Sequence, residues 1–543
     1  MEPLGNGLQI RKFAGVLAWA LSLAINALLV SSVSAFDFDI KLPGLGLIEE
    51  LADHPEIAAF YRERDFAPIW TSGDQAAQIR LQTLMDSVLA APNHGLPYGQ
   101  NDLMHIRSLI NLPDTVVNRA AVEAQLSEIY VRLATSLSSG AIDPRSVDSS
   151  IARESQPPDV ESLLRGISGS DPAGYLRNLV PNTLQYVMLR RELKRLDRVI
   201  ETNGWGDLVE AKLLQEGDEG LAVVQLRNRL IRMGYMRRTP DPRFTASLSF
   251  AVKQFQKDHG LTSDGIADTT TLEAVNIEPQ QRRRQVVAAL ERERWLNYPL
   301  GDKHVRVNIA DFHADVILAG KSIFTTRVVV GQSQARLQTP EFSDQMTHMV
   351  INPTWYVPRS ITTKEILPQL QEDPAAEPQL QMFTQEDGII DRRGVDFQNY
   401  TAANFPYDFK QPPGPKNALG EVKFMFPNRF NVYMHDTPQR TLFQREIRNY
   451  SHGCIRVHRA EEFAEFLLSR SIDDPQSYYH SIRDSGKEQI WELPAPLPVH
   501  ITYRTAFLGR DGRMHYRDDI YGRDQTLYER LKQSVPLIGR LSV

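Results

Sequence analysis

The chain has 543 residues, of which 42% are hydrophobic and 24% are charged, and its formal net charge is -6. A single hydrophobic core rarely serves so long a chain, so about two to four globular domains are expected. The negative charge argues against a general polyanion binder such as a nucleic-acid-binding protein, although it does not exclude a local basic groove.

The N-terminal segment has the pattern of an export signal. The basic residues Arg11 and Lys12 precede a long apolar run, and Val33 and Ala35 then stand at the spacing of a small-residue cleavage site. These parts in this order are typical of a secretory signal peptide. We therefore expect residues 1–35 to direct export and, if they are not cleaved, to anchor the protein in the membrane. No later stretch approaches the roughly 20 apolar residues of a transmembrane helix.

Residues 36–205 are expected to form a helical scaffold domain. Apolar residues recur at helical spacing within residues 81–96, 120–140 and 183–196. This spacing predicts amphipathic helices that bury one face. None of these segments carries a catalytic signature, so their pattern assigns no activity to the scaffold.

Residues 206–280 have a different pattern. An amphipathic helix over residues 221–235 is followed by a second helix, a Gly-Leu turn, an Asp-Gly turn and a third, short helix. This order resembles the three-helix peptidoglycan-binding module of many cell-wall enzymes. The matching residues are Leu226, Leu230, Gly234, Tyr235, Phe255, Gln256, Gly260, Leu261, Asp264, Gly265, Thr270 and Leu272. The sequence "PDPRF" stands where the family often has Asp-Gly, so a spacer that kept the fold without its ligand is the alternative to a working module.

The basic sequence that follows, residues 281–296, predicts a connecting helix at the start of the last domain, residues 281–543. We expect Val286, Leu290 and Trp295 to face inward and the charged side chains to form one solvated face.

From residue 303 the apolar period changes to two, which predicts strands. Segments rich in Val, Ile, Phe and Tyr cover residues 304–312, 313–318, 324–331, 347–357, 422–426, 431–435, 498–508 and 513–519. A helix is expected over residues 459–470. The strand pattern stops between about residues 356 and 420, and so long an insertion usually means a lid, a binding loop or disorder. The fold class is therefore α+β and multidomain, with a β-rich last domain that carries a lid-like insertion.

Cys454 is the single cysteine of the chain and ends the sequence Ser-His-Gly-Cys. A lone cysteine in an exported protein indicates a reactive thiol or an intermolecular bond, and the alternative is a small buried hydrophobic residue. A thiol needs a base or a cationic neighbour to react at neutral pH, and His435, at the end of a predicted strand, is the candidate. Gly453 lets the backbone approach closely, so nearby amides can face a developing oxyanion.

This constellation resembles the L,D-transpeptidases with a YkuD-type catalytic domain. Their signature is a histidine, a spacer, and then Ser or Thr followed by His-Gly-Cys, and the matching residues here are His435, Ser451, His452, Gly453, Cys454 and Arg456. The sequence "INPTWYVP" at residues 351–358 and the segment around Gly331 also look like this family. The order of signal, scaffold, binding module and catalytic domain with a large insertion is similar to the large multidomain enzymes of Gram-negative bacteria.

The resemblance implies a cysteine-dependent transfer reaction on peptidoglycan. The thiol would attack the carbonyl of the third stem residue, release the terminal D-alanine and form a thioester that an amine of a second stem opens. It implies Cys454 and His435 as catalytic residues; Gly453, His452, Ser451, Arg456 and Tyr433 as oxyanion or supporting residues; and Trp355, Asn352 and Tyr356 as substrate-binding residues. It also implies no cofactor and no metal, stem peptides as donor and acceptor, other cell-wall synthesis enzymes as candidate partners, a periplasmic location and acylation by carbapenems.

Other interpretations use the same residues. A zinc site of His435, His452, Cys454 and His458 is one, but it leaves the glycine of the motif unexplained, and we expect His458 to be structural. A non-catalytic peptidoglycan-binding or anchoring factor is another, against which the presence of both Cys454 and His435 argues. An L,D-carboxypeptidase or a transferase that attaches a lipoprotein would differ only in the acceptor, which would be water or a lysine amine; a free D-amino acid is a further acceptor that the sequence leaves open.

Overall fold

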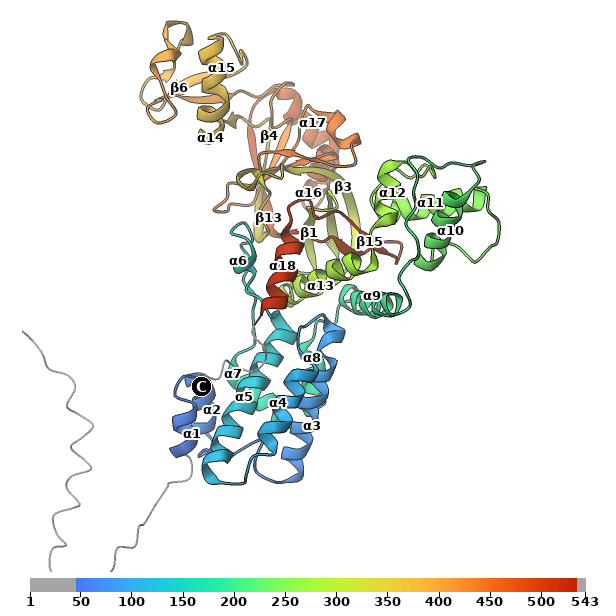
Figure 1. The fold of residues 1–543 in the computed structure, drawn as a ribbon. Helices are drawn as coiled ribbons and strands as arrows, with labels where there is room; N and C mark the ends of the chain where they lie inside the picture. Colours follow the sequence, from blue (N-terminus) through green and yellow to red (C-terminus); the bar gives the residue numbers. More distant parts are fainter. Residues whose placement is uncertain (1–44, 535–543) are drawn as a thin grey trace, which may run out of the picture.

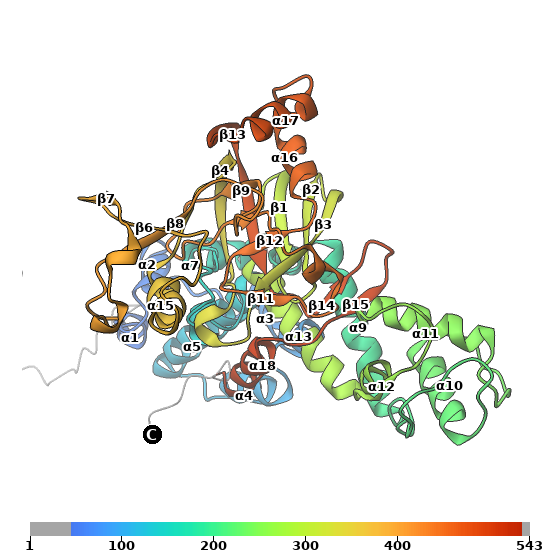
Figure 2. The ribbon, with the colours of Figure 1, turned by 90° about the horizontal axis from the view of Figure 1, so that it is seen from above.

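The structure is a computed structural model that describes residues 45–534, so the expected signal segment lies outside the described residues. A helical domain, a three-helix module and a β-rich domain form separate lobes around the central helix α13 (Pro279–Trp295), as Figure 1 shows. Seen from above in Figure 2, the three-helix module and an insertion of the β-rich domain extend on opposite sides of the sheet. The mixed helical and β fold is the one that the sequence predicts. Among the helices of residues 45–534, none combines the length and the apolar character that a membrane crossing requires.

The scaffold is a bundle of helices with its own core. The helices of this core are α1 (Leu45–Glu50), α2 (Pro55–Arg62), α3 (Gln75–Ala90), α4 (Gln100–Ile110), α5 (Val116–Ser139), α7 (Val160–Ile167) and α8 (Pro172–Leu179). Two further helices of the segment, α6 (Pro144–Val147) and α9 (Leu184–Glu201), contribute to a second core with α13. The side chains of Asp74 and Thr115 accept hydrogen bonds from the first-turn amides of α3 and α5, which stabilises those helix starts. Glu123, buried in α5, accepts from the amides of Trp70 and Thr71, so the loop before α3 is fastened to the bundle.

The residues that resemble a peptidoglycan-binding module build the core of the second lobe. This lobe contains α10 (Leu221–Met233), α11 (Ala246–Asp258) and α12 (Thr269–Asn276). Leu230 and Phe255 are almost fully buried. The buried amide of Gln256 donates to Asp264 and accepts from the N–H of Gly265. The polar residues of the match therefore fix the turn between α11 and α12.

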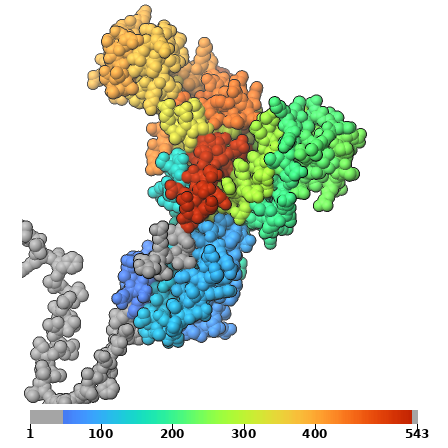
Figure 3. All heavy atoms as spheres, viewed as in Figure 1, coloured from blue at the N-terminus to red at the C-terminus, as the bar shows by residue number. Residues whose placement is uncertain are grey.

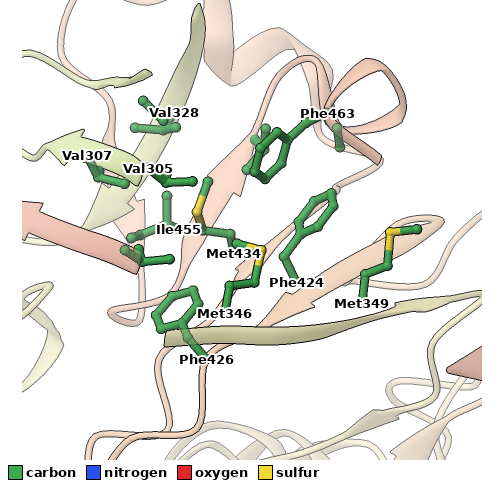
Figure 4. Close-up of a cluster of buried hydrophobic side chains, with 14 of the residues drawn as sticks. Val305, Val307, Val328, Met346, Met349, Phe424, Phe426, Met434, Ile455 and Phe463 are labelled. Carbon is green, nitrogen blue, oxygen red and sulfur yellow. The ribbon is translucent and has the colours of Figure 1, made fainter. Parts of the chain in front are cut away.

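The β-rich domain is built on one curved sheet. Its strands are β1 (Lys303–Asn308), β2 (His313–Leu318), β3 (Lys321–Gly331), β4 (Phe342–Ile351), β9 (Val422–Met425), β10 (Met434–His435), β11 (Asn449–Ser451), β12 (Ile455–Val457) and β13 (Gln489–Thr502). The order is β11-β3-β12-β10-β9-β4-β13-β1-β2, and β2 also pairs with β3, so every one of these strands except β11 belongs to a closed ring. Figure 4 shows the core against this sheet, where Phe424 of β9 packs on Phe463 of α16 (Ala460–Leu468) with ring centroids 4.7 Å apart. Helix α17 (Pro475–Ser485) follows α16.

The insertion is a folded unit. It contains β5 (Trp355–Tyr356), α14 (Arg359–Ile361), a π-helix (Thr362–Ile366), α15 (Leu367–Glu372), β6 (Gln381–Thr384), β7 (Gly388–Ile389) and β8 (Asp408–Gln411). Its four strands form a second sheet in the order β5-β8-β6-β7 around a core that includes Leu370, Met382, Phe397 and Phe409. In Figure 3 it forms a separate knob on the β-rich domain. The prediction that strands stop here is wrong, because these strands are too short to show a clear period of two.

Helix α13 differs from the expected surface helix. The predicted inward residues are buried, but so are the charged side chains of its second half. Arg292 contacts both Glu341 and Asp524, and Arg294 pairs with Glu291. The prediction of one solvated face is therefore wrong for this part of the helix. The scaffold, the sheet and the C-terminal elements β14 (Ala506–Leu508), β15 (Met514–Tyr516) and α18 (Arg523–Gln533) surround it, so its charges need internal partners.

Candidate active site

Strand register determines which side chains share the polar face of the sheet. β10 runs parallel to β12, with Met434 opposite Ile455 and His435 opposite Arg456. Side chains alternate along a strand, so paired residues lie on the same face. Met434 and Ile455 belong to the buried core, which places His435 and Arg456 on the opposite face.

Tyr433 and Cys454 lie on the same polar face. Each stands two residues before a side chain of that face, His435 and Arg456 respectively, and side chains alternate along a strand. The amide of Ile455 donates to the carbonyl of Tyr433 at 3.0 Å, which continues the ladder. The rings of Tyr433 and His435 meet edge to face with centroids 5.6 Å apart. The sequence-predicted thiol, histidine, tyrosine and arginine thus come together through two very short parallel strands.

The turn that carries the thiol is held by side-chain hydrogen bonds. Gly453 has φ +113°, a conformation that favours glycine. The buried Ser451 hydroxyl donates to the Cys454 carbonyl at 2.5 Å and accepts from the Gly453 amide at 3.1 Å. Thr339, fully buried, donates to the Gly453 carbonyl at 2.9 Å and accepts from the Gly331 amide at 2.8 Å. No motif in the sequence marks Thr339 as a functional residue. It lies in the segment around Gly331 that resembles the family, and this is the one indication of its role.

The thiol of Cys454 is protonated in the resting site. The side chain is half-buried, and burial raises the pKa of the thiol to about 11. Hydrogen bonds from the backbone and side chain of Tyr433 and the charge of Arg456 lower this pKa without cancelling the effect of burial. Since a free thiol titrates at about 8.5, this thiol is harder to ionise than a free one.

His435 is a neutral imidazole with a defined tautomer. It is 5% exposed, and burial, together with the charges of Arg456 and Lys423, lowers its pKa to about 3 although a hydrogen bond with Asp436 opposes this. Nδ1 lies 2.6 Å from the carbonyl oxygen of Asp436. A carbonyl only accepts, so Nδ1 carries the proton and Nε2 has the free lone pair. Of the two roles that the sequence suggested, this geometry favours a base over a cationic neighbour.

Arg456 has a free donor on the polar face. Its Nη1 donates to Gln439 Oε1 at 2.5 Å. Its Nε is buried and, within the described part of the chain, has no hydrogen-bond partner. A buried donor without a partner is costly, so this N–H suits an acceptor oxygen of a ligand.

His452 connects the turn to the insertion. Its Nε2 lies 2.8 Å from Glu365 Oε1, and the two side chains are 34% and 40% exposed. Glu365 lies in the π-helix of the insertion, and π-helical turns occur frequently at functional sites. No sequence motif marks Glu365, because its relevance comes only from this contact between distant segments.

The predicted substrate-binding residues lie at the root of the insertion. Trp355 and Tyr356 form β5 and pair with Gln411 and Lys410 of β8. Trp355 packs against the core of the insertion, whereas Tyr356 is 61% exposed.

Asn352 has a structural role in this geometry. It is buried, and its side-chain amide donates to the carbonyls of Ile482, Arg483 and Lys487. These bonds tie the end of β4 to α17. His458 packs on the ring of Phe443, with centroids 4.9 Å apart.

The three histidines of the zinc alternative have separate partners: His435 bonds a backbone carbonyl, His452 contacts Glu365 and His458 packs on a phenyl ring. Within residues 45–534, two groups of side chains are close enough to share a metal ion, namely Asp258 with Asp511 and His515, and Glu461 with Glu465 and His480. Neither group includes Cys454.

Three family models match consecutive parts of the chain. Residues 302–486 match the L,D-transpeptidase catalytic domain (YkuD), residues 219–275 match a domain described as "Putative peptidoglycan binding domain", and residues 55–193 match a domain described as "Scaffold domain". The chain thus carries an L,D-transpeptidase catalytic domain together with a peptidoglycan-binding domain.

Individual relatives cover parts of the chain. A Haemophilus influenzae protein named "Putative L,D-transpeptidase" is 30% identical over 223 residues, which are 41% of this chain and 44% of that protein, so the match spans less than half of the relative. The solved L,D-transpeptidase from Xylanimonas cellulosilytica (residues 123–326) is 14% identical, covers 55% of this chain and 100% of that chain, and has a TM-score of 0.17. The L,D-transpeptidase from Stackebrandtia nassauensis is 14% identical, with coverages of 55% and 97% and a TM-score of 0.21.

Proposed function

We propose that the protein is a cysteine-dependent L,D-transpeptidase that links the third residues of two peptidoglycan stem peptides. The observation that carries the proposal is the polar face of β10 and β12, where Cys454, Tyr433, His435 and Arg456 stand together. The catalytic-domain match over residues 302–486 supports it. The signal pattern at the N-terminus supports export to the periplasm, where this substrate lies.

Acylation begins with a proton transfer coupled to attack. The pKa values of about 11 for the Cys454 thiol and about 3 for His435 differ so much that a separated thiolate–imidazolium pair in the resting site would cost on the order of 10 kcal/mol. His435 Nε2 therefore accepts the thiol proton as Sγ bonds to the carbonyl carbon of the third stem residue. Positioned base catalysis of this kind contributes roughly a hundred- to ten-thousandfold to the rate.

The oxyanion formed by this attack needs donors. The amide of Gly453 already donates to Ser451, so the backbone amide of Cys454 and Nε of Arg456 are the better candidates. The imidazolium of His435 then protonates the amine of the departing D-alanine, and a thioester remains on the cysteine.

Transfer reverses these proton movements. The amine of a second stem attacks the thioester carbonyl and gives a proton to His435. Sγ leaves and takes this proton back, so the free thiol is regenerated and an amide joins the two stems. The atoms balance without a cofactor.

The insertion is proposed to protect the thioester from water until the amine arrives. Glu365 of the insertion contacts His452, which is two residues from the nucleophile. Asn417 closes the base of the insertion by donating to the carbonyls of Pro353 and Gln411. Both ends of the insertion are therefore fixed, and its π-helix reaches the catalytic turn.

The proposal is tested by incubating the mature protein with a defined disaccharide-tetrapeptide and analysing the products by mass spectrometry. We expect a cross-linked dimer, release of D-alanine and a transient protein adduct. Cys454→Ala should give none of these while its circular dichroism stays that of the parent. Cross-linking by Cys454→Ala would refute the mechanism, and a tripeptide without dimer would favour the carboxypeptidase alternative.

A further inference from the structure

A cavity separate from the Cys454 site lies where three lobes meet. Its volume is about 250 Å³, and its walls come from α9 of the scaffold, α10, α11 and α12 of the binding module, α13, and the β14–β15 hairpin. None of the residues that line it belongs to the Cys454 site. Two of its side chains, Trp205 and Asp258, carry a buried polar atom without a hydrogen-bond partner in the described part of the chain, and Arg282 is a buried cation of the lining.

Arg282 supplies a positive charge to the lining, and its Nη2 also donates to the carbonyl of Ala274 at 3.4 Å. It is 3% exposed, stacks on Tyr516 at 5.0 Å and donates to Gln285 Oε1 at 3.0 Å. Within residues 45–534 it makes no ion pair with a carboxylate. The other two arginines of the cavity are neutralised, because Arg195 pairs with Glu192 at 2.7 Å and Arg513 with Asp258 at 2.7 Å. The lining charge is thus positive, which favours an anionic ligand.

Two further polar atoms of the lining lack a hydrogen-bond partner. The indole N–H of Trp205, a side chain 4% exposed, has no hydrogen-bond acceptor in the described part of the chain. Oδ1 of Asp258, a side chain 1% exposed, has no donor at hydrogen-bond distance there, and Nε2 of His515 lies 3.7 Å from it. Nearly all buried polar atoms in folded proteins are paired. A cavity that holds an unpaired donor, an unpaired acceptor and a guanidinium without a carboxylate at ion-pairing distance is therefore suited to an anionic ligand that also carries an N–H group.

We propose that this junction cavity binds the carboxylate end of an amino acid or short peptide. The carboxylate accepts from Arg282 and from the Trp205 N–H, and the amide N–H or ammonium of the same ligand donates to Asp258 Oδ1. Since a cavity of about 150 Å³ holds a benzene molecule, there is room here for about ten non-hydrogen atoms, which one or two small residues fill. The aromatic wall of Tyr235 and Phe255 suits a methyl side chain.

The source of this ligand rests on the proposed function. If the protein acts on peptidoglycan, the carboxylate-terminated end of an uncross-linked stem peptide has the required chemistry, and a free D-amino acid has the same carboxylate and nitrogen. In either case the bound group would lie between the binding module, the scaffold and the catalytic lobe, and not at the thiol.

The test uses the full mature chain carrying Cys454→Ala, so that acyl transfer cannot contribute. The full sequence has six tryptophans, of which Trp19 lies in the expected signal segment. The indole resonances of the other five are followed after ¹⁵N labelling, with the Trp205 signal assigned by its loss in Trp205→Phe. N-acetyl-D-alanyl-D-alanine, its C-terminal amide and free D-alanine are titrated separately. We expect the dipeptide acid to shift the Trp205 signal in a saturable way and the amide to bind at least about tenfold more weakly. Saturation by free D-alanine as well would identify a free amino acid as a ligand, and saturation by the dipeptide alone a stem end.

Variants decide whether the cavity is responsible. Arg282→Gln should weaken binding of the acid about tenfold or more, because a charge-assisted bond is lost, whereas Arg284→Gln, which alters an exposed arginine of the same helix, should not. If Arg282→Gln does not fold, calorimetry on Trp205→Phe, which removes one N–H and keeps an aromatic ring, serves instead and should also show weaker binding. Equal affinity for acid and amide, unchanged affinity in the folded variant, or a shift at the Trp355 signal without one at Trp205 would overturn this site. The last result would leave the proposed function standing.

Discussion

The pH dependence of thiol alkylation tests whether the Cys454 thiol is protonated in the resting site. With a pKa of about 11, only about 0.03% of Cys454 is thiolate at pH 7.5, compared with about 10% of a free thiol that titrates at about 8.5. Because the thiolate is the reactive form, a small reagent should alkylate Cys454 about 300-fold more slowly than a model thiol at this pH. Each further pH unit up to about pH 10 should raise the rate about tenfold.

Intact-mass measurement with iodoacetamide between pH 5 and pH 10 provides the assay, and the chain has a single cysteine, so every adduct reports this site. His435→Ala should leave the alkylation profile nearly unchanged, because a neutral imidazole adds no charge, while it strongly slows acylation by a stem peptide. Tyr433→Phe should lower the alkylation rate, because it removes a hydrogen bond that lowers the thiol pKa. A plateau of fast alkylation between pH 5 and pH 8 that disappears in His435→Ala would refute this reasoning, because it would reveal a resting thiolate–imidazolium pair.

Further predictions concern the base, the nucleophile, the turn and the insertion. The folded pKa of His435 lies below its unfolded value, so its contribution to folding stability is complete above about pH 6.5 and is lost as the pH falls toward 3. Urea titrations of His435→Gln should therefore show a dependence of the unfolding free energy on pH that is shallower by about 1.4 kcal/mol per pH unit in that range. An unchanged dependence would contradict the assignment. A carbapenem should add its mass to the protein but not to Cys454→Ala, and no adduct after long incubation would argue against an accessible site. Thr339→Val should cost about 1–3 kcal/mol of folding stability, because the Gly453 carbonyl and the Gly331 amide lose their partner, with Thr339→Ser as the control that keeps the hydroxyl. Replacing residues 358–407 by a short Gly-Ser turn that joins β5 to β8 should leave alkylation unchanged, reduce cross-linking and raise the hydrolysed share, and equal cross-linking would exclude a lid.

The sequence predicts the parts of the fold that depend on local periodicity. Helices of the scaffold and module and the longer strands of the sheet follow from apolar periods of 3.6 and 2, and the motif around Cys454 is recognisable because its residue types are rare in this combination. The order of the strands in the ring does not follow from local periodicity, because β10 and β12 are very short and their partners lie far apart in the chain. Their register, which sets the face of His435 and Arg456, cannot be derived from local pattern.

Residues that act through distant contacts were missed for the same reason. Thr339 supports the turn that carries Cys454 from the segment between β3 and β4, and Glu365 reaches His452 from the insertion. Neither has a neighbour in sequence that indicates its partner. The charges of α13 were assigned to solvent because a helix pattern shows which residues are polar but not which lobes will cover them. Arg282 was part of that basic run, and its place in a cavity follows only from the meeting of three lobes.

The position of β13 has a consequence for how the molecule is assembled. This strand lies between β4 and β1 and completes the ring, yet it is encoded after the cysteine and after residue 486, where the catalytic-domain match ends. The ring therefore cannot close until β13 has paired with both β4 and β1. A recombinant fragment cut at residue 486 would leave the β4 and β1 edges unpaired, and unpaired edges invite aggregation with other chains. Closure of the sheet that carries Cys454 thus depends on a segment that lies beyond the matched domain.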